Sequence, residues 1–175
     1  LLMIKSLMFY LEKIVLPMNL SPMYPYVGSI GLGFPEFFLP GLAFVALIIV
    51  TLWSLRRTRE ALFALGFVVL TIAPSLVNFR KGEEGDIYIA SDRYAYLASI
   101  ALIIPAAALL TKFRTRYRWP FDIGVAAVVV SFMVLTFQQS LVWKDTEALF
   151  RNVTRHYPNA HIAHINLGYL HYERG

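Results

Sequence analysis

A group of polar side chains lies where a long apolar stretch begins, in the segment Asp92-Arg93-Tyr94-Ala95-Tyr96. A guanidinium such as that of Arg93 can hold a phosphate through a two-pronged hydrogen bond, and the N–H groups at the start of a helix favour the same anion. The tyrosine side chains can hydrogen-bond a sugar or stack on it. We therefore take Asp92, Arg93, Tyr94 and Tyr96 as candidates for binding a phosphorylated sugar.

The same residues also suit a structural role. At a membrane interface, arginine extends its charge toward the headgroups and tyrosine joins the aromatic belt. On composition alone, this anchoring interpretation is favoured over substrate binding. It predicts that lysine can replace Arg93 without loss, because an anchor needs only the charge.

Residue types exclude several other kinds of site. The chain has no cysteine, so disulfide scaffolds, cysteine zinc sites and thiol chemistry are excluded. Three of its histidines, His161, His164 and His171, would fall near one side of a helix. The last two are two helical turns apart, about 10 Å, which is too far for one shared metal ion. We therefore predict no metal site.

The elements that position the candidate residues are predicted to be membrane helices. Hydrophobic residues make up 58% of the 175-residue chain and charged residues 15%, and the mean hydropathy is +0.58. Soluble domains are roughly 25% charged. Four stretches without charge have the length of roughly 17–25 residues that a spanning helix needs. They are 37–55, 61–79, 94–111 and 123–143.

These spans predict an all-α fold with a polytopic membrane domain over residues 37–143. No Asp, Glu, Lys, Arg or His lies inside the four spans. Proton relays, ion channels and charge-driven transporters place ionisable groups within the membrane, so none of these is expected.

The short loops predict the orientation of the spans. Loops 56–60 and 112–118 together hold seven Lys/Arg in twelve residues, whereas loop 80–93 holds three in fourteen beside four acidic residues. By the positive-inside rule, the first two loops are cytoplasmic. Loop 80–93, the segment before residue 37 and the tail after residue 143 then share the outer side. The net charge of +5 therefore comes mostly from the loops that set the orientation of the spans. Nucleic acid is not an expected partner.

The two ends of the chain differ from the spans. Residues 1–16 are predicted to form an amphipathic helix in the membrane interface, with Lys5, Ser6, Glu12 and Lys13 on its polar side. A spanning helix truncated at its start is the alternative. Residues 17–36 are rich in proline and glycine and are predicted to form an outer loop.

The tail 144–175 matches the register of a tetratricopeptide repeat. Phe150 and Pro158 are spaced as in one repeat, and Gly168 lies where the next repeat places its Leu-Gly. We predict one helix at about 144–157 and another at about 160–173. Stable arrays need about three repeats, so more are expected after Gly175. Such arrays bind proteins or peptides on a concave surface.

The ordered motifs resemble one family, the transmembrane and tetratricopeptide repeat proteins. The segment Asp92-Arg93-Tyr94-Ala95-Tyr96-Leu97-Ala98-Ser99 is similar to the family's acidic-Arg-Tyr-x-Tyr-Leu-Pro-Ser motif, with Ala98 in place of the usual proline. Three further segments resemble the family in order and spacing: 14–21 with Tyr24, 143–150, and 166–168.

This resemblance implies a membrane glycosyltransferase of the GT-C superfamily, similar to O-mannosyltransferases and with bacterial relatives. Its donor would be a polyprenyl-phosphate sugar held at Arg93, and its acceptor a protein Ser or Thr presented by the repeats. The family's presumed catalytic carboxylate lies in its first outer loop, which is expected upstream of this sequence. No catalytic residue is therefore assigned, since nothing ties Asp86 or Asp92 to proton abstraction.

A second hypothesis is a scaffold in which the membrane helices only anchor a repeat array that recruits protein partners. Both hypotheses predict an integral membrane protein with the repeats on the non-cytoplasmic side. A bacterial inner membrane is favoured, or the endoplasmic reticulum membrane in a eukaryote. The expected partners are membrane lipid, a lipid-linked sugar and a protein or peptide acceptor.

Overall fold

A computed structural model describes residues 1–26, 28, 30–31, 33–56, 58–77, 87–114 and 118–174. The described chain is mostly helical, which confirms the predicted fold class at that level. Its elements are, in order, α1 Leu2–Val15, β1 Tyr24–Tyr26, α2 Pro35–Ser54, α3 Glu60–Val77, β2 Ile87–Ala90, the 3-10 turn η1 Asp92–Tyr94, α4 Ala95–Arg114, α5 Arg118–Val142, α6 Thr146–His156 and α7 His161–Arg174.

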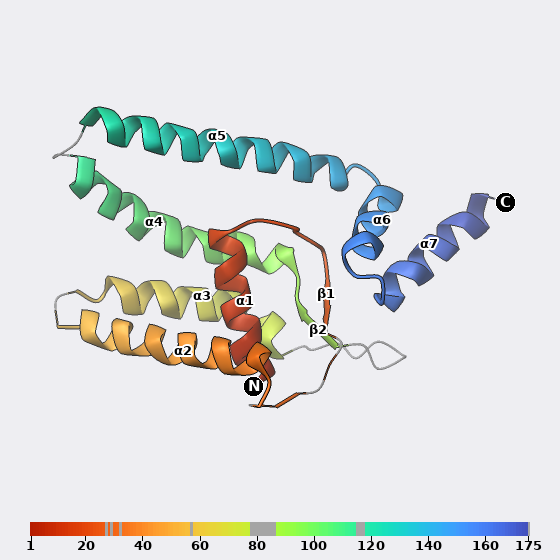
Figure 1. The fold of residues 1–175 in the computed structure, drawn as a ribbon, viewed down its shortest axis with the longest axis horizontal. Helices are drawn as coiled ribbons and strands as arrows, with labels where there is room; N and C mark the ends of the chain where they lie inside the picture. Colours follow the sequence, from red (N-terminus) through yellow and green to blue (C-terminus); the bar gives the residue numbers. More distant parts are fainter. Residues whose placement is uncertain are drawn as a thin grey trace.

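Helices α2 to α5 lie lengthwise beside one another, each in contact with the next along the chain (Figure 1). Three described helical segments are long and apolar enough to cross a membrane: Pro35–Ser54, Asp92–Thr111 and Arg118–Val142. The predicted span 61–79 corresponds to α3, whose described apolar part, Glu60–Leu76, is shorter. Asn78 and Phe79, at the end of that predicted span, lie outside the described residues.

The two ends of this bundle differ in charge and in architecture. The last turns of α2 and α4 and the first turns of α3 and α5 lie at one end of the bundle (Figure 1). Arg56 and Arg59 lie between α2 and α3 in sequence, and Arg114 and Arg118 end α4 and begin α5, so we call it the basic end. Helix α1, strands β1 and β2, and helices α6 and α7 lie at the opposite end, which we call the ribbon end (Figure 1). The candidate residues 92–96 are therefore at the ribbon end, away from the basic connections.

Helix α1 runs across α3 and α4 at the ribbon end instead of lying along them (Figure 1). Its helical extent agrees with the prediction for residues 1–16, but its polar side is not simply solvated. Ser6 is fully buried and donates a hydrogen bond to the carbonyl oxygen of Ile89 in β2. Lys5 is also mostly covered, because its ammonium lies 2.8 Å from Glu36 and over the ring of Tyr26.

Strands β1 and β2 form a two-stranded antiparallel ribbon that the all-α prediction did not include. Tyr24 is opposite Ala90 and Tyr26 is opposite Ile87, with an irregularity after Tyr24. The ribbon lies between α1 and the α6–α7 pair (Figure 1). It turns part of the expected outer loop 17–36 into a fixed support for the start of α4.

Helices α6 and α7 lie where two helices were predicted, with a break at 157–160. Asp145 caps α6, since its carboxylate accepts a hydrogen bond of 2.7 Å from the N–H of Ala148. Val153, Ala160 and Ala163 are fully buried between the two helices. The carboxylate of Glu147 in α6 pairs with Arg174 of α7, which closes the pair at its other end.

The main core lies where α1 crosses the bundle, and α3 supplies its centre. Val68 and Ile72 are fully buried there and pack in one cluster with Leu7 and Tyr10 of α1 and Ala98 of α4. This cluster fixes the start of α4 relative to α1.

We expect Ile72→Ala to destabilise the protein, because it leaves a cavity in this cluster. Such truncations of buried aliphatic side chains cost about 2–5 kcal/mol. Leu70→Ala is the matched control in the same helix, since Leu70 is 75% exposed. Thermal unfolding in detergent would measure both variants. Equal midpoints would contradict the assigned core.

Candidate functional site

The candidate residues lie at the junction between strand β2 and helix α4. Ser91 is extended, with φ −150° and ψ 131°, and residues Asp92–Tyr94 then make one 3-10 turn before α4 begins at Ala95. Three residues per turn send successive side chains about 120° apart. The neighbours Asp92 and Arg93 are therefore directed to different surroundings.

Asp92 points into the protein. Its side chain is 8% exposed, and its Oδ1 atom accepts a hydrogen bond of 2.6 Å from the hydroxyl of Tyr24. Its backbone N–H donates to the carbonyl oxygen of Ser21 at 3.4 Å. The Oδ2 atom is buried and has no hydrogen-bond partner among the described residues. One carboxylate oxygen is thus engaged in structure, and the other is not.

Tyr24 is almost completely buried and connects three parts of the chain. Its hydroxyl accepts a hydrogen bond of 2.9 Å from the N–H of Ser21 while it donates to Asp92. Its ring meets the rings of Phe9 in α1 and Tyr157 after α6, with centroid distances of 4.6 and 5.8 Å. Burial and the adjacent Asp92 carboxylate raise the pKa of Tyr24, so the hydroxyl stays protonated and keeps donating.

A second buried hydroxyl holds Ser91, the residue before the turn. The hydroxyl oxygen of Tyr10 accepts a hydrogen bond of 2.9 Å from the N–H of Ser91. It lies 2.6 Å from the hydroxyl oxygen of Ser75 in α3. Burial is the main cause that raises the pKa of Tyr10. Helices α1 and α3 therefore fix the backbone from which Asp92 and Arg93 project.

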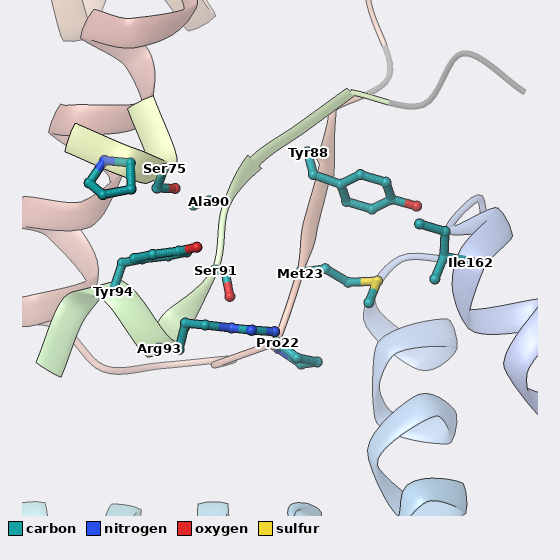
Figure 2. A pocket seen from close by; sticks show the side chains of 10 residues that line it. Pro22, Met23, Ser75, Tyr88, Ala90, Ser91, Arg93, Tyr94 and Ile162 are labelled. Atoms are coloured by element: carbon teal, nitrogen blue, oxygen red, sulfur yellow. The ribbon is translucent and has the colours of Figure 1, made fainter. Parts of the chain in front are cut away.

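Arg93 projects outward. It is exposed, and no described residue gives it a hydrogen bond or an ion pair. With Tyr94, it borders a pocket of about 180 Å³ that we call the arginine pocket. Figure 2 shows Arg93 and Tyr94 extending from the start of α4, Tyr88 from β2, and Ile162 of α7 on the far side. The lining includes four residues that carry a hydroxyl group: Ser75, Tyr88, Ser91 and Tyr94.

The four predicted site residues do not share one pocket. Arg93 and Tyr94 line the arginine pocket, whereas Asp92 and Tyr96 line a different cleft of about 460 Å³. We call this the α4–α5 cleft, since most of its walls come from those helices. Tyr96 is 69% exposed at its edge. Of the four predicted residues, only Arg93 and Tyr94 therefore line the arginine pocket.

The hydroxyl groups that set this geometry were not predicted from the sequence. Tyr10 and Ser75 had no role assigned to them, and Ser21 and Tyr24 entered only through a family motif. Their one visible signal is a polar side chain in a largely apolar segment, as at Ser75 in α3. Among the described residues, no three His, Cys, Asp or Glu side chains come close enough to hold a metal ion.

No protein family, no curated protein and no solved structure matches the chain. The geometry of the site therefore carries the functional argument by itself.

We expect Tyr24→Phe to lower the stability of the protein, because it leaves the buried Asp92 carboxylate without its hydrogen-bond donor. Loss of a hydrogen bond to a buried charged group costs about 1.5–3 kcal/mol. Tyr96→Phe is the matched control, since it removes the hydroxyl of an exposed tyrosine at the second position of α4. Thermal midpoints in detergent measure the difference. A Tyr24→Phe midpoint as high as that of Tyr96→Phe would contradict the assigned role.

Proposed function

We propose that the chain is part of an integral-membrane glycosyltransferase of the GT-C type, similar to protein O-mannosyltransferases. It would move a mannose-like sugar from a polyprenyl-phosphate donor to a protein Ser or Thr on the non-cytoplasmic face. The observation that carries the proposal is Arg93, an exposed guanidinium without an ionic partner among the described residues, bordering a pocket with Tyr94 at the ribbon end.

The chemistry of the pocket suits the phosphate of such a donor. When the sugar leaves, negative charge grows on the departing phosphate, and a cationic hydrogen-bond donor stabilises that charge. The Arg93 guanidinium can offer two parallel N–H groups to it. Tyr94 supplies a hydroxyl group for the sugar in the same lining. We assign no catalytic base, and Asp86 lies outside the described residues.

The proposal includes four membrane spans, with α3 as the span after α2. It is supported by the arrangement in Figure 1, where α3 lies beside α2 and α4 and the two basic connections share one end. Under the positive-inside rule the basic end faces the cytoplasm, and the arginine pocket then opens on the other side. The membrane is proposed to be a bacterial inner membrane.

The α6–α7 pair is proposed to be the start of a tetratricopeptide repeat array that presents the acceptor. Its position supports this role, since Ile162 at the start of α7 borders the arginine pocket. An acceptor held along α7 would have its hydroxyl near the sugar.

A membrane-anchored scaffold is the second candidate, and one observation favours it. Ile165, Tyr169 and Tyr172 of α7 are 63%, 61% and 84% exposed. Their spacing places them along one side of the helix. Such an apolar surface suits a protein partner whether or not a sugar is transferred.

Labelling of introduced cysteines would test the orientation. The chain has no cysteine of its own, and both Thr58 and Asn159 are exposed. In intact cells, a membrane-impermeant maleimide should label Asn159→Cys and leave Thr58→Cys unlabelled until the cells are opened. The reverse pattern would reject the proposed side of the arginine pocket.

Substitution of Arg93 would test sugar transfer. Loss of one charged contact costs about 1.5–3 kcal/mol, so Arg93→Ala should lower the transfer rate roughly tenfold to a hundredfold. Arg93→Lys should recover little, since an ammonium cannot form the two-pronged contact. The assay follows labelled sugar from polyprenyl phosphate to peptide in membranes that contain the protein.

Arg155→Ala is the matched control, because Arg155 is an exposed arginine at the ribbon end that does not line the pocket. Full activity of Arg93→Ala at equal protein level would exclude the phosphate contact. Full rescue by lysine would favour the anchoring interpretation.

A further inference from the structure

The arginine pocket has two walls of different chemistry. Arg93 and Tyr94 line it from the start of α4. Met23, just before β1, and Ile162, in the first turn of α7, line it as well. Figure 2 shows the Met23 side chain extending toward Ile162, with Arg93 and Tyr94 on the other side. We call the wall formed by Met23 and Ile162 the apolar wall.

The backbone behind the apolar wall is fixed in both segments. The hydroxyl of Ser21 donates to the carbonyl oxygen of Met23 at 2.7 Å. In α7, the side-chain amide of Asn166 donates to the carbonyl oxygen of Ile162 at 2.7 Å. Ala163, the next residue after Ile162, is fully buried. The backbone is therefore in place before a ligand arrives, and little of it has to be ordered on binding.

The charge of the pocket is all on the other wall. Among the described residues that line the pocket, Arg93 is the one that carries a charge. Neither Met23 nor Ile162 can pair with a charged group, and a polar group pressed against them would lose its water. An aliphatic side chain is stabilised there, because the contact removes it from water. Methionine adapts its shape, so the wall suits aliphatic side chains of more than one size.

The apolar wall is formed by elements outside the bundle of long helices. Met23 precedes the ribbon and Ile162 belongs to the α6–α7 pair, and both elements lie at the ribbon end (Figure 1). The isoprenoid chain of a donor lies in the membrane, along helices such as α4 and α5. A ligand that reaches the apolar wall therefore comes from the side of α7, where the proposed function places the protein acceptor.

An extended peptide fits the two walls together. Successive side chains of an extended segment point to opposite sides. When an acceptor hydroxyl faces the sugar beside Arg93 and Tyr94, the side chain next to it in the peptide faces Met23 and Ile162. A hydroxyl residue with an aliphatic neighbour therefore fits both walls.

We propose that the apolar wall is an acceptor subsite for an aliphatic side chain directly beside the Ser or Thr that receives the sugar. Met23 and Ile162 are specificity-determining residues for that neighbour. The inference rests on the proposed sugar transfer and names its acceptor class. In that transfer, the hydroxyl oxygen bonds to the anomeric carbon of the sugar and the bond from that carbon to the phosphate breaks. The hydroxyl proton ends on the released polyprenyl phosphate.

Transfer to three matched peptides would test the subsite. Each peptide has one threonine, flanked on both sides by valine, by glutamate or by lysine, with alanine elsewhere. The labelled polyprenyl-phosphate sugar is kept at a saturating concentration, so the acceptor determines the rate. We expect kcat/KM of the unchanged protein to be about tenfold higher for the valine peptide than for either charged peptide, because valine is removed from water at the apolar wall.

Ile162→Lys should reverse this order. The introduced ammonium pairs with a flanking glutamate, so the glutamate peptide becomes the best acceptor. The new charge has the same sign as Arg93 and does not neutralise it. A variant that is merely damaged would lose all three peptides alike. Asn159→Lys is the matched control, because Asn159 is exposed, lies three residues earlier and does not line the pocket. It should keep the original order.

A second measurement does not need sugar transfer. The chain has no cysteine, so Ile162→Cys and Asn159→Cys each introduce a single thiol. Two peptides carry one cysteine, either next to the threonine or six residues away, activated as a disulfide with thiopyridine. The protein thiolate displaces the thiopyridine and captures the peptide.

Ile162→Cys should capture the first peptide about tenfold faster than the second, since binding places that sulfur at the apolar wall. Asn159→Cys should not distinguish the two peptides. The ratio within one variant removes the effect of the different exposure of the two thiols.

The outcomes separate the subsite from sugar transfer. Equal transfer to the three peptides by the unchanged protein would overturn the subsite and leave the glycosyltransferase standing. Selective capture by Ile162→Cys without transfer to any peptide would support a peptide site and reject the glycosyltransferase. Equal capture of the two peptides by Ile162→Cys, or an unchanged order in Ile162→Lys, would overturn the assignment.

Discussion

The hydrogen bond from Tyr24 to Asp92 is the contact on which the ribbon end depends. It joins residues 68 positions apart and places a carboxylate where water does not reach it. A buried carboxylate is costly unless donors surround it, so the segment 21–24 has to stay against the start of α4. The same tyrosine ring carries contacts from Phe9 and Tyr157. Helices α1, α4 and α6 are therefore held through one side chain.

The four long helices of the bundle bury few residues against one another. In the apolar stretches of α2, α4 and α5, only 11%, 11% and 0% of the residues are buried inside the described structure. Such helices satisfy their backbone hydrogen bonds internally and leave their side chains for a lipid environment. Residues of α2 and α4 join the core near the crossing with α1, where Val68 and Ile72 of α3 lie. The position of the candidate site thus comes from the short elements at one end, and the long helices supply the frame.

The sequence predicts the parts of this fold that depend on local pattern. A long uncharged stretch has few alternatives to a helix, which is why α2, α4 and α5 were predicted within a few residues. The break at Pro158 separates α6 from α7 for an equally local reason. The ribbon has no such signal, because strands of three and four residues are too short to show alternation. Nor does any local pattern pair Tyr24 with Asp92.

The turn Asp92–Tyr94 explains why neighbouring motif residues have unlike roles. In a 3-10 turn, consecutive side chains point about 120° apart, so one position can face the interior while the next faces outward. Asp92 is held from inside by Tyr24, and this contact fixes the backbone from which Arg93 extends. Arg93 then extends beside its pocket, and none of the acidic residues that the structure describes pairs with it, since its neighbour Asp92 is turned into the protein. Within the motif, Asp92 therefore fixes the backbone and Arg93 faces the pocket. In the sequence alone, the two residues appear as one polar cluster.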